Sequence, residues 1–270
     1  MNLSIQQTLL PGADLSERFQ RAAEYGFSGV EVVAWGFPGP MPDHLAEIEK
    51  AMQASGLPVS SLCTKGTDDF VHPDPAEREK RLSGLVQMLK LADTLGARGV
   101  VSVPIRLPVT MPDLSPLMDE RTLITQLATL ILTSVLERTA GGRAAIFLEP
   151  LNRYGAKYLR TVAQAAELCR AVDHPRVQIM ADMFHMNIEE ADIPAALRSV
   201  AAHVGHIHLA DSNHLLPGHG HTDFVRPFRA LREANFQGWL ALECGVPGNP
   251  AETLPAAAHF LKICWQDAAP

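Results

Sequence analysis

The chain has 270 residues, a length at which an α/β barrel of roughly 250 residues still forms one domain around a single core. Its 23 Lys and Arg residues against 30 Asp and Glu residues give a net charge of −7, which opposes binding to nucleic acid or to an anionic membrane surface. The four cysteines stand far apart without a CxxC pair, so neither a thiolate zinc site nor a disulfide framework is indicated. No secretory signal is evident and no stretch reaches the roughly 20 apolar residues of a membrane span, so we expect a soluble, cytoplasmic protein.

Short apolar, β-branched runs alternate with longer amphipathic stretches along the chain, which predicts buried parallel strands followed by helices. The predicted strands are Leu3–Thr8, Gly29–Val33, Pro58–Cys63, Gly99–Val103, Ala144–Leu148, Val177–Ala181, Val204–Leu209 and Trp239–Leu242. The predicted helices are Leu15–Tyr25, Pro42–Ser55, Pro75–Leu95, Arg121–Arg138, Thr161–Val172, Ile193–Ala202, Phe224–Ala234 and Pro250–Trp265. No linker interrupts this alternation, so we predict an α/β fold with one domain over residues 1–270, a (β/α)8 TIM barrel. A doubly wound open sheet would give a similar local pattern.

Helix-boundary residues support these elements. Asp14 is placed to cap the first helix, and Pro75 suits the first turn of the third. Gly56 and Gly96 follow helices at positions that favour a left-handed backbone. The longest irregular stretch, Pro104–Ser115, follows the fourth strand, so we expect it to form a lid or wall at the catalytic mouth of a barrel.

Four residues that commonly bind metals stand at the ends of four successive strands. Glu149 ends the fifth strand, Asp182 the sixth and Glu243 the eighth, while His208 lies near the end of the seventh. Their separations of 33, 26 and 35 residues each correspond to about one strand-plus-helix unit. Because side chains alternate in direction along a strand, all four can point inward at the same rim.

Three carboxylates and an imidazole at one rim would repel one another without a cation. Any one of these carboxylates, taken alone, is as readily explained as a helix cap or an ion-pair partner, but four in register favour a metal site. An oxygen-rich set with one nitrogen suits Mn²⁺, with Mg²⁺ and Co²⁺ as alternatives. We therefore expect one divalent metal ion per chain.

Several segments carry a family resemblance. They are LEPLNRY (148–154), ADMFHMNIEE (181–190), GHIHLADSN (205–213), PGHGHTDF (217–224) and LALEC (240–244). The chain resembles the xylose-isomerase-like barrel superfamily, especially its sugar phosphate isomerase/epimerase branch with D-tagatose 3-epimerase. The resemblance implies a metal held by Glu149, Asp182, His208 and Glu243, with both glutamates also acting as acid/base groups. It further implies that His185 contacts a substrate oxygen.

Such a site moves a proton between carbons of a small sugar-like substrate. A metal at the carbonyl oxygen stabilises the enediolate that forms when a glutamate removes the neighbouring proton. Two glutamates on opposite faces would invert the carbon, as in a ketose 3-epimerase. A single base that returns the proton to the adjacent carbon would give aldose–ketose isomerisation. The sequence leaves both outcomes open and predicts an isomerase.

Two other functions compete with this one. A metal-dependent lyase or dehydratase acting on a keto-sugar, a keto-inositol or a 3-keto-glycoside would use the same stabilised intermediate. An AP endonuclease-type phosphodiesterase would need a three-zinc cluster with extra histidines at the ends of the third and fourth strands. Those ends read SLCTKG (61–66) and VSVPIR (101–106), without histidine.

Further residues are candidates for substrate binding. Asn152 and Arg153 follow the first metal glutamate in a rim loop, where Arg153 either holds a substrate oxygen or pairs with a carboxylate. His214 lies in a histidine-containing loop after the seventh strand. His206 shares the inward direction of His208, one layer deeper, and is more consistent with a supporting or core histidine than with a ligand.

Two positions depart from the ketose 3-epimerases that the chain resembles. Gly155 stands where those enzymes carry a glutamate, and His214 stands where they carry an arginine, both of which contact substrate in the family. The proton-transfer residues are kept while the substrate contacts differ, so a free ketohexose is not the expected substrate. A sugar phosphate, a sugar acid, an inositol-pathway ketone and a 3-keto-glycoside stay open, as do homodimer and homotetramer assemblies.

Overall fold

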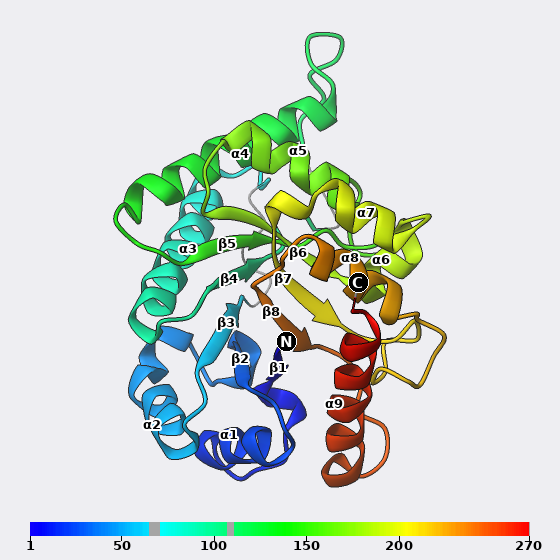
Figure 1. The fold of residues 1–270 in the computed structure, drawn as a ribbon. Coiled ribbons are helices and arrows are strands. Elements are labelled where there is room, and N and C mark those ends of the chain that lie inside the picture. Colours follow the sequence, from blue (N-terminus) through cyan, green and yellow to red (C-terminus); the bar gives the residue numbers. More distant parts are fainter. Residues whose placement is uncertain (65–70, 107–110, 270) are drawn as a thin grey trace.

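The computed structural model describes residues 1–64, 71–106 and 111–269. Within them, eight parallel strands close into a barrel in which each strand pairs with the next and the eighth with the first (Figure 1). The strands are β1 (Asn2–Gln6), β2 (Gly29–Val33), β3 (Val59–Cys63), β4 (Gly99–Ser102), β5 (Ala145–Leu148), β6 (Val177–Asp182), β7 (Val204–Leu209) and β8 (Trp239–Leu242). The predicted TIM barrel is confirmed, and the open-sheet alternative is wrong, because an open sheet leaves its edge strands unpaired.

Helices surround the barrel and cover the outer face of its strands (Figure 1). They are α1 (Leu15–Glu24), α2 (Leu45–Ser55), α3 (Pro75–Leu95), α4 (Glu120–Arg138), α5 (Val162–Val172), α6 (Met183–Glu189), α7 (Ile193–Ser199), α8 (Val225–Glu233) and α9 (Pro250–Asp267). Short 3-10 turns occupy Gln7–Leu9, Ala34–Gly36, Met41–His44 and Ala201–His203. The predicted helices agree to within a few residues, and α6 is an addition that the sequence does not predict. None of the helices in the described residues is long and apolar enough to cross a bilayer.

The expected boundary residues act as caps. Asp14 accepts a hydrogen bond from the backbone N–H of Glu17, and Pro75 is the first residue of α3. Gly56 and Gly96 end α2 and α3 with φ of 71° and 70°, a left-handed backbone that costs glycine least. Local sequence therefore fixes where these helices begin and end.

The barrel interior is divided between apolar and polar side chains. A small apolar cluster, separate from the main core between strands and helices, consists of Val33, Cys63, Val101, Ala145, Phe147 and Met180. The polar residues buried on the strands include Gln6, Glu31, Ser61, His206 and His208. These polar groups need partners inside the barrel, because buried unpaired polar atoms are costly.

Strand register places the predicted ligands side by side. Asp182 of β6 lies opposite His208 of β7, and His208 lies opposite Ala241 of β8, two residues before Glu243. The connection from β4 to α4 contains the predicted lid, of which residues 107–110 lie outside the described residues. Residues 111–119, which are described, project beyond the N-terminal end of α4 (Figure 1).

Candidate metal centre

The four predicted ligands stand at the C-terminal ends of their strands. Glu149 directly follows β5, Asp182 is the last residue of β6, His208 is the fifth residue of β7 and Glu243 directly follows β8. Ligand atoms of Glu149, Asp182 and His208, all buried, lie within 4.8 Å of one another. Glu243 does not join them at that distance. Three of the four residues are thus brought together, and the fourth ends the neighbouring strand.

Asp182 divides its two oxygens between two roles. Its Oδ1 accepts hydrogen bonds from the backbone N–H groups of Phe184 (2.7 Å) and His185 (3.3 Å), which caps α6. Its Oδ2 is buried without a hydrogen-bond partner and lies 3.9 Å from Nδ1 of His208. The helix-cap explanation and the metal-ligand explanation of this carboxylate therefore apply to different atoms of the same side chain.

Two buried acceptors that face each other without hydrogen-bond partners form a donor set that fits a cation. Nδ1 of His208 also has no hydrogen-bond partner among the described residues. Leaving a buried polar atom unsatisfied costs about 1–3 kcal/mol. A carboxylate oxygen and an imidazole nitrogen are both ligands of Mn²⁺, Co²⁺ and Zn²⁺, so a divalent ion fits this donor set.

Two carboxylates of the rim are held in contrasting electrostatic environments. Burial raises the pKa of Glu149, and the nearby His185 and His208 only partly oppose this effect. Burial would also raise the pKa of Glu243, but a hydrogen bond from His214 and the charge of His208 lower it below the usual range. Carboxylates whose pKa values are pushed apart suit opposite acid and base roles.

His208 is surrounded by carboxylates. Burial alone would lower its pKa, but the charge of Glu31, with Glu149 and Glu243 adding to it, raises the pKa to about 10 in the absence of a cation. Such a strong attraction for a proton shows how much negative charge converges on this ring. The same charge would favour a bound metal ion.

His185 and Asn152 form a pair beside Glu149. Nε2 of His185 lies 3.6 Å from Oε1 of Glu149, and its Nδ1 lies 2.9 Å from the side-chain nitrogen of Asn152. Oδ1 of Asn152 accepts the backbone N–H of Tyr154, so this amide is held in place by its own loop. Asn152 therefore orients His185, and the predicted substrate contact of His185 stays a prediction.

Arg153 forms an ion pair with Glu189. Its Nε donates to Oε1 of Glu189 at 2.7 Å, and its Nη2 donates to the carbonyl of Ile188 at 3.2 Å. Of the two interpretations of Arg153, the structure shows the pairing with a carboxylate. A substrate contact would require the guanidinium to leave Glu189.

His214 contacts Glu243 directly. Its Nε2 donates to Oε2 of Glu243 at 3.0 Å, and its ring stacks on Phe184 with centroids 4.3 Å apart. Its backbone has φ of 60°, a left-handed conformation that is uncommon outside glycine and costs of order 1–3 kcal/mol. Buried Asp211 holds the loop in shape, because its oxygens accept the backbone N–H groups of Ser212, Gly218 and Thr222.

Gly155 does not leave the open space that its small size suggests. A Cβ atom at this position would lie 3.0 Å from Cδ1 of Leu151. Leu151 belongs to a small apolar cluster with Val103 and Ala156. The side that a larger residue would occupy is therefore already filled by Leu151.

Glu31 is the buried charge that the sequence reasoning missed. It lies in the middle of β2 with no exposed surface and contacts both His206 and His208. The available signal was a lone carboxylate inside the apolar run GVEVV, since a charge is almost never fully buried unless it is paired. His206 is a supporting histidine in this geometry, because it hydrogen-bonds Glu31 and stacks on Phe147.

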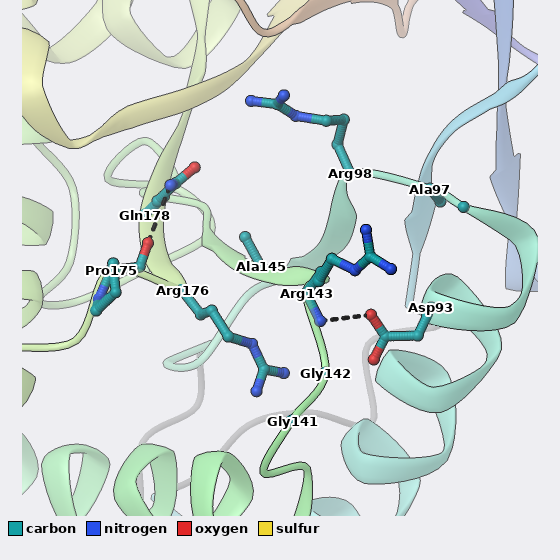
Figure 2. Close-up of a pocket in the computed structure, with 11 residues that line it drawn as sticks. Asp93, Ala97, Arg98, Gly141, Gly142, Arg143, Ala145, Pro175, Arg176 and Gln178 are labelled. Atoms are coloured by element: carbon teal, nitrogen blue, oxygen red, sulfur yellow. Dashed lines mark hydrogen bonds between the residues drawn. The ribbon is translucent and has the colours of Figure 1, made fainter.

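A roughly 630 Å³ cavity lies away from this rim, at the N-terminal ends of β4, β5 and β6 (Figure 2). The side chains of Arg98, Arg143 and Arg176 line it, but Arg176 is fixed by hydrogen bonds to Thr139 and to the carbonyl of Ala144. None of the predicted site residues lines it. The N-terminal face of a TIM barrel usually serves stability, so the size of this cavity does not mark an active site.

Comparisons with known proteins show the family of the chain. The chain matches the family described as xylose isomerase-like TIM barrel over residues 19–264. A 3-dehydro-D-guloside 4-epimerase of Escherichia coli is 30% identical, covering 98% of this chain and 100% of that protein. A probable ketose 3-epimerase of Synechocystis is 29% identical, covering 83% of this chain and 76% of that protein.

A solved structure extends the likeness to three dimensions. The crystal structure of a 3-keto-D-glucoside 4-epimerase from E. coli has a TM-score of 0.84 to this chain at 28% identity, covering 98% of this chain and 100% of that one. The relatives are named epimerases, which are isomerases. The chain is therefore an enzyme of the isomerase class and belongs to the xylose isomerase-like TIM barrel family.

Proposed function

We propose that the protein is a metal-dependent epimerase that inverts a carbon next to a ketone in a sugar derivative. The observation that carries the proposal is the pair of unpartnered buried atoms, Oδ2 of Asp182 and Nδ1 of His208, with Glu149 beside them. Glu149, Asp182, His208 and Glu243 would hold the ion, with Mn²⁺ as the first choice. When bound, the ion would supply positive charge next to the oxygen on which negative charge develops.

The two glutamates would carry the proton. One removes it from the carbon beside the ketone, and the other delivers a proton to the opposite face, which inverts the centre. Burial raises the pKa of Glu149, whereas at Glu243 burial is outweighed by the hydrogen bond from His214 together with the charge of His208 and the pKa is lowered, so Glu149 is the better suited of the two to donate a proton and Glu243 to accept one. The base becomes protonated and the acid deprotonated in each turnover, and exchange between them or with water restores the starting state.

The residues around the glutamates would position the substrate. His185 presents its Nε2 near Glu149, and His214 lies beside Glu243, so hydroxyl groups on two sides of the substrate have donors available. Asn152 keeps the ring of His185 in place. Arg153 would contribute only after release from Glu189.

A 3-keto-glycoside is the substrate class we propose. Two relatives that match over 98% of this chain and 100% of their own length, at 30% and 28% identity, are named for 3-dehydro-D-guloside and 3-keto-D-glucoside, in which the carbon to be inverted neighbours the C3 ketone. The departures at Gly155 and His214 also separate this chain from enzymes that act on free ketohexoses. The proposal includes one domain over residues 1–270, a homodimer or homotetramer, and a cytoplasmic location.

Deuterium exchange tests the proposal. Metal-free protein would be reloaded with Mn²⁺, exchanged into D₂O and incubated with methyl 3-keto-D-glucoside or, in parallel, D-psicose, with NMR as the readout. We expect deuterium at C4 together with inversion of that carbon, and loss of both with EDTA. Release of methanol or of water would instead identify a lyase or a dehydratase. Metal-loaded protein that exchanges no proton in either sugar would overturn the proposal.

A further inference from the structure

Glu31 is the centre of a hydrogen-bond network inside the barrel. Its Oε1 accepts from Nε2 of Gln6 at 2.9 Å, and its Oε2 accepts from Oγ of Ser61 at 2.7 Å and from Nε2 of His206 at 2.9 Å. Nε2 of His208 lies 2.9 Å from Oε1, in an ion-pair contact bent away from ideal hydrogen-bond geometry. Donors from β1, β3 and β7 therefore converge on one carboxylate of β2.

This network is not a second metal site. Ligand atoms of Glu31, His206 and His208 lie within 4.8 Å of one another, as those of a metal site would. However, the amide of Gln6 and the hydroxyl of Ser61 also point at the carboxylate, and an amide N–H donor would oppose a cation. The oxygens of Glu31 are thus already satisfied by protein donors.

The contact with Glu31 decides which nitrogen of His208 carries the proton. A carboxylate 2.9 Å from Nε2 favours a proton on that nitrogen. In the neutral ring, Nδ1 then keeps its lone pair, and Nδ1 is the atom that faces Oδ2 of Asp182. A histidine binds a metal only through a nitrogen with a free lone pair, so the carboxylate on one side prepares the ring for a metal on the other.

We propose that Glu31 is a positioning residue that fixes the ring orientation and the proton location of His208, so that Nδ1 is presented to the metal. This inference rests on the proposed metal centre. The donors from Gln6, Ser61 and His206 hold Glu31 itself in place, because they satisfy the remaining lone pairs of its carboxylate. Glu31 touches neither substrate nor metal, and its effect passes through His208.

Glu31→Gln is the variant that tests this role. Glutamine has nearly the same shape, but it removes the negative charge that favours a proton on Nε2 of His208. Loss of such a support typically lowers metal affinity about 10–100-fold. We would measure the Kd for Mn²⁺ of the metal-free protein by competition with a chromophoric chelator. Circular dichroism and thermal unfolding without metal would check the fold.

Ser61→Ala is the matched control. It removes one donor to Oε2 and leaves the contact between Oε1 and His208 intact, so its Kd should stay within about threefold of the wild type. A loss of affinity equal to that of Glu31→Gln would show that any disturbance of the buried network suffices, and would overturn the specific role of Glu31.

A measurement on the unmodified protein keeps the inference testable if Glu31→Gln does not fold. Long-range ¹H–¹⁵N spectra of the zinc-loaded protein should show His208 protonated at Nε2 and metal-bound at Nδ1. The reverse assignment would overturn the inference. Wild-type protein that binds no divalent ion would instead contradict the proposed function, whereas normal binding by Glu31→Gln would contradict only the role of Glu31.

Discussion

The two halves of the barrel wall contribute differently to its C-terminal rim. Strands β5 to β8 carry the four proposed metal ligands, and two of these residues keep ligand atoms without hydrogen-bond partners. Strands β1 to β3 carry Gln6, Glu31 and Ser61, which are buried and hydrogen-bonded into one network. In the proposed enzyme, β5 to β8 would supply the metal-binding and proton-transferring atoms, and β1 to β3 would hold His208 in place. Substitutions in β5 to β8 should therefore change kcat and metal binding directly, whereas substitutions in β1 to β3 should act on metal affinity through His208.

The largest effect should come from the two glutamates that follow β5 and β8. Glu149→Gln and Glu243→Gln should each lower kcat by about 10²–10⁴-fold, because a positioned acid or base contributes that much, and weaker metal binding adds to the loss. Glu233→Gln on α8 removes a carboxylate that only pairs with Arg198 at the surface, so it should retain its activity. If either rim variant turned over at the wild-type rate with metal bound, the two-base assignment would be wrong.

A smaller effect is expected on stability when Asp182 is changed. Asp182→Asn keeps an oxygen to cap α6 but removes the charge beside His208. At a metal concentration of about 100 times Kd, bound metal should stabilise the wild type by about 2.7 kcal/mol, and Asp182→Asn should lose most of this gain. Thermal unfolding with Mn²⁺ and with EDTA measures the difference. Asp192→Asn, which alters the cap of α7, should keep the full metal effect.

The sequence predicts the proposed ligands on β5 to β8 better than the supporting residues on β1 to β3. The ligands follow strands at intervals of one βα unit, so position and residue type coincide at Glu149, Asp182 and Glu243. The sequence analysis misses Glu31 because an apolar run is interpreted as a buried strand whatever its middle residue is. The hydrogen-bond partners of Glu31 also lie 25 to 175 residues away in the sequence. The left-handed backbone of His214 likewise depends on the folded loop, in which the carbonyl of His214 accepts a hydrogen bond from the backbone N–H of Gly245 beyond β8.

The next prediction concerns the loop that carries His214. Burial would raise the pKa of Asp211, but four backbone N–H groups lower it to about 2. A depressed folded-state pKa stabilises the protein above the unfolded value of 3.8, and this stability is lost as pH falls through about 2. Asp211→Asn should therefore cost about 2 kcal/mol at pH 7 and roughly half as much near pH 3.

Denaturant unfolding of the metal-free protein at several pH values tests this expectation. Asp223→Asn removes a carboxylate that accepts from the first residues of α8 and does not hold the loop, so it is the control. A cost for Asp211→Asn that did not change between pH 7 and pH 3 would show that the carboxylate charge is not what orders the loop.

The smallest expected effect lies in substrate preference at His214. The hydrogen bond to Glu243 raises the pKa of His214, so its positive charge is present below that raised value and is lost as pH rises through it. Substrate binding that uses this charge should weaken at alkaline pH, whereas His214→Arg should remove the pH dependence because guanidinium stays charged. The longer side chain should also raise kcat/KM for a free ketohexose relative to a 3-keto-glycoside by about tenfold, the value of one charged hydrogen bond.

Gly155→Glu can be added to this test only if Leu151, the residue that a side chain at position 155 would meet, is made smaller. Because a Cβ at position 155 meets Leu151 at 3.0 Å, the glutamate should be combined with Leu151→Ala as well as with His214→Arg. Leu151→Ala alone is the control for lost packing. We would measure kcat/KM for both sugars and metal content across pH 6–9 in each variant. A ratio of the two kcat/KM values that stays at the wild-type level in the triple variant, with metal content intact, would show that neither position sets specificity. The specificity contacts would then lie in the connection between β4 and α4, of which residues 111–119 project from the barrel (Figure 1).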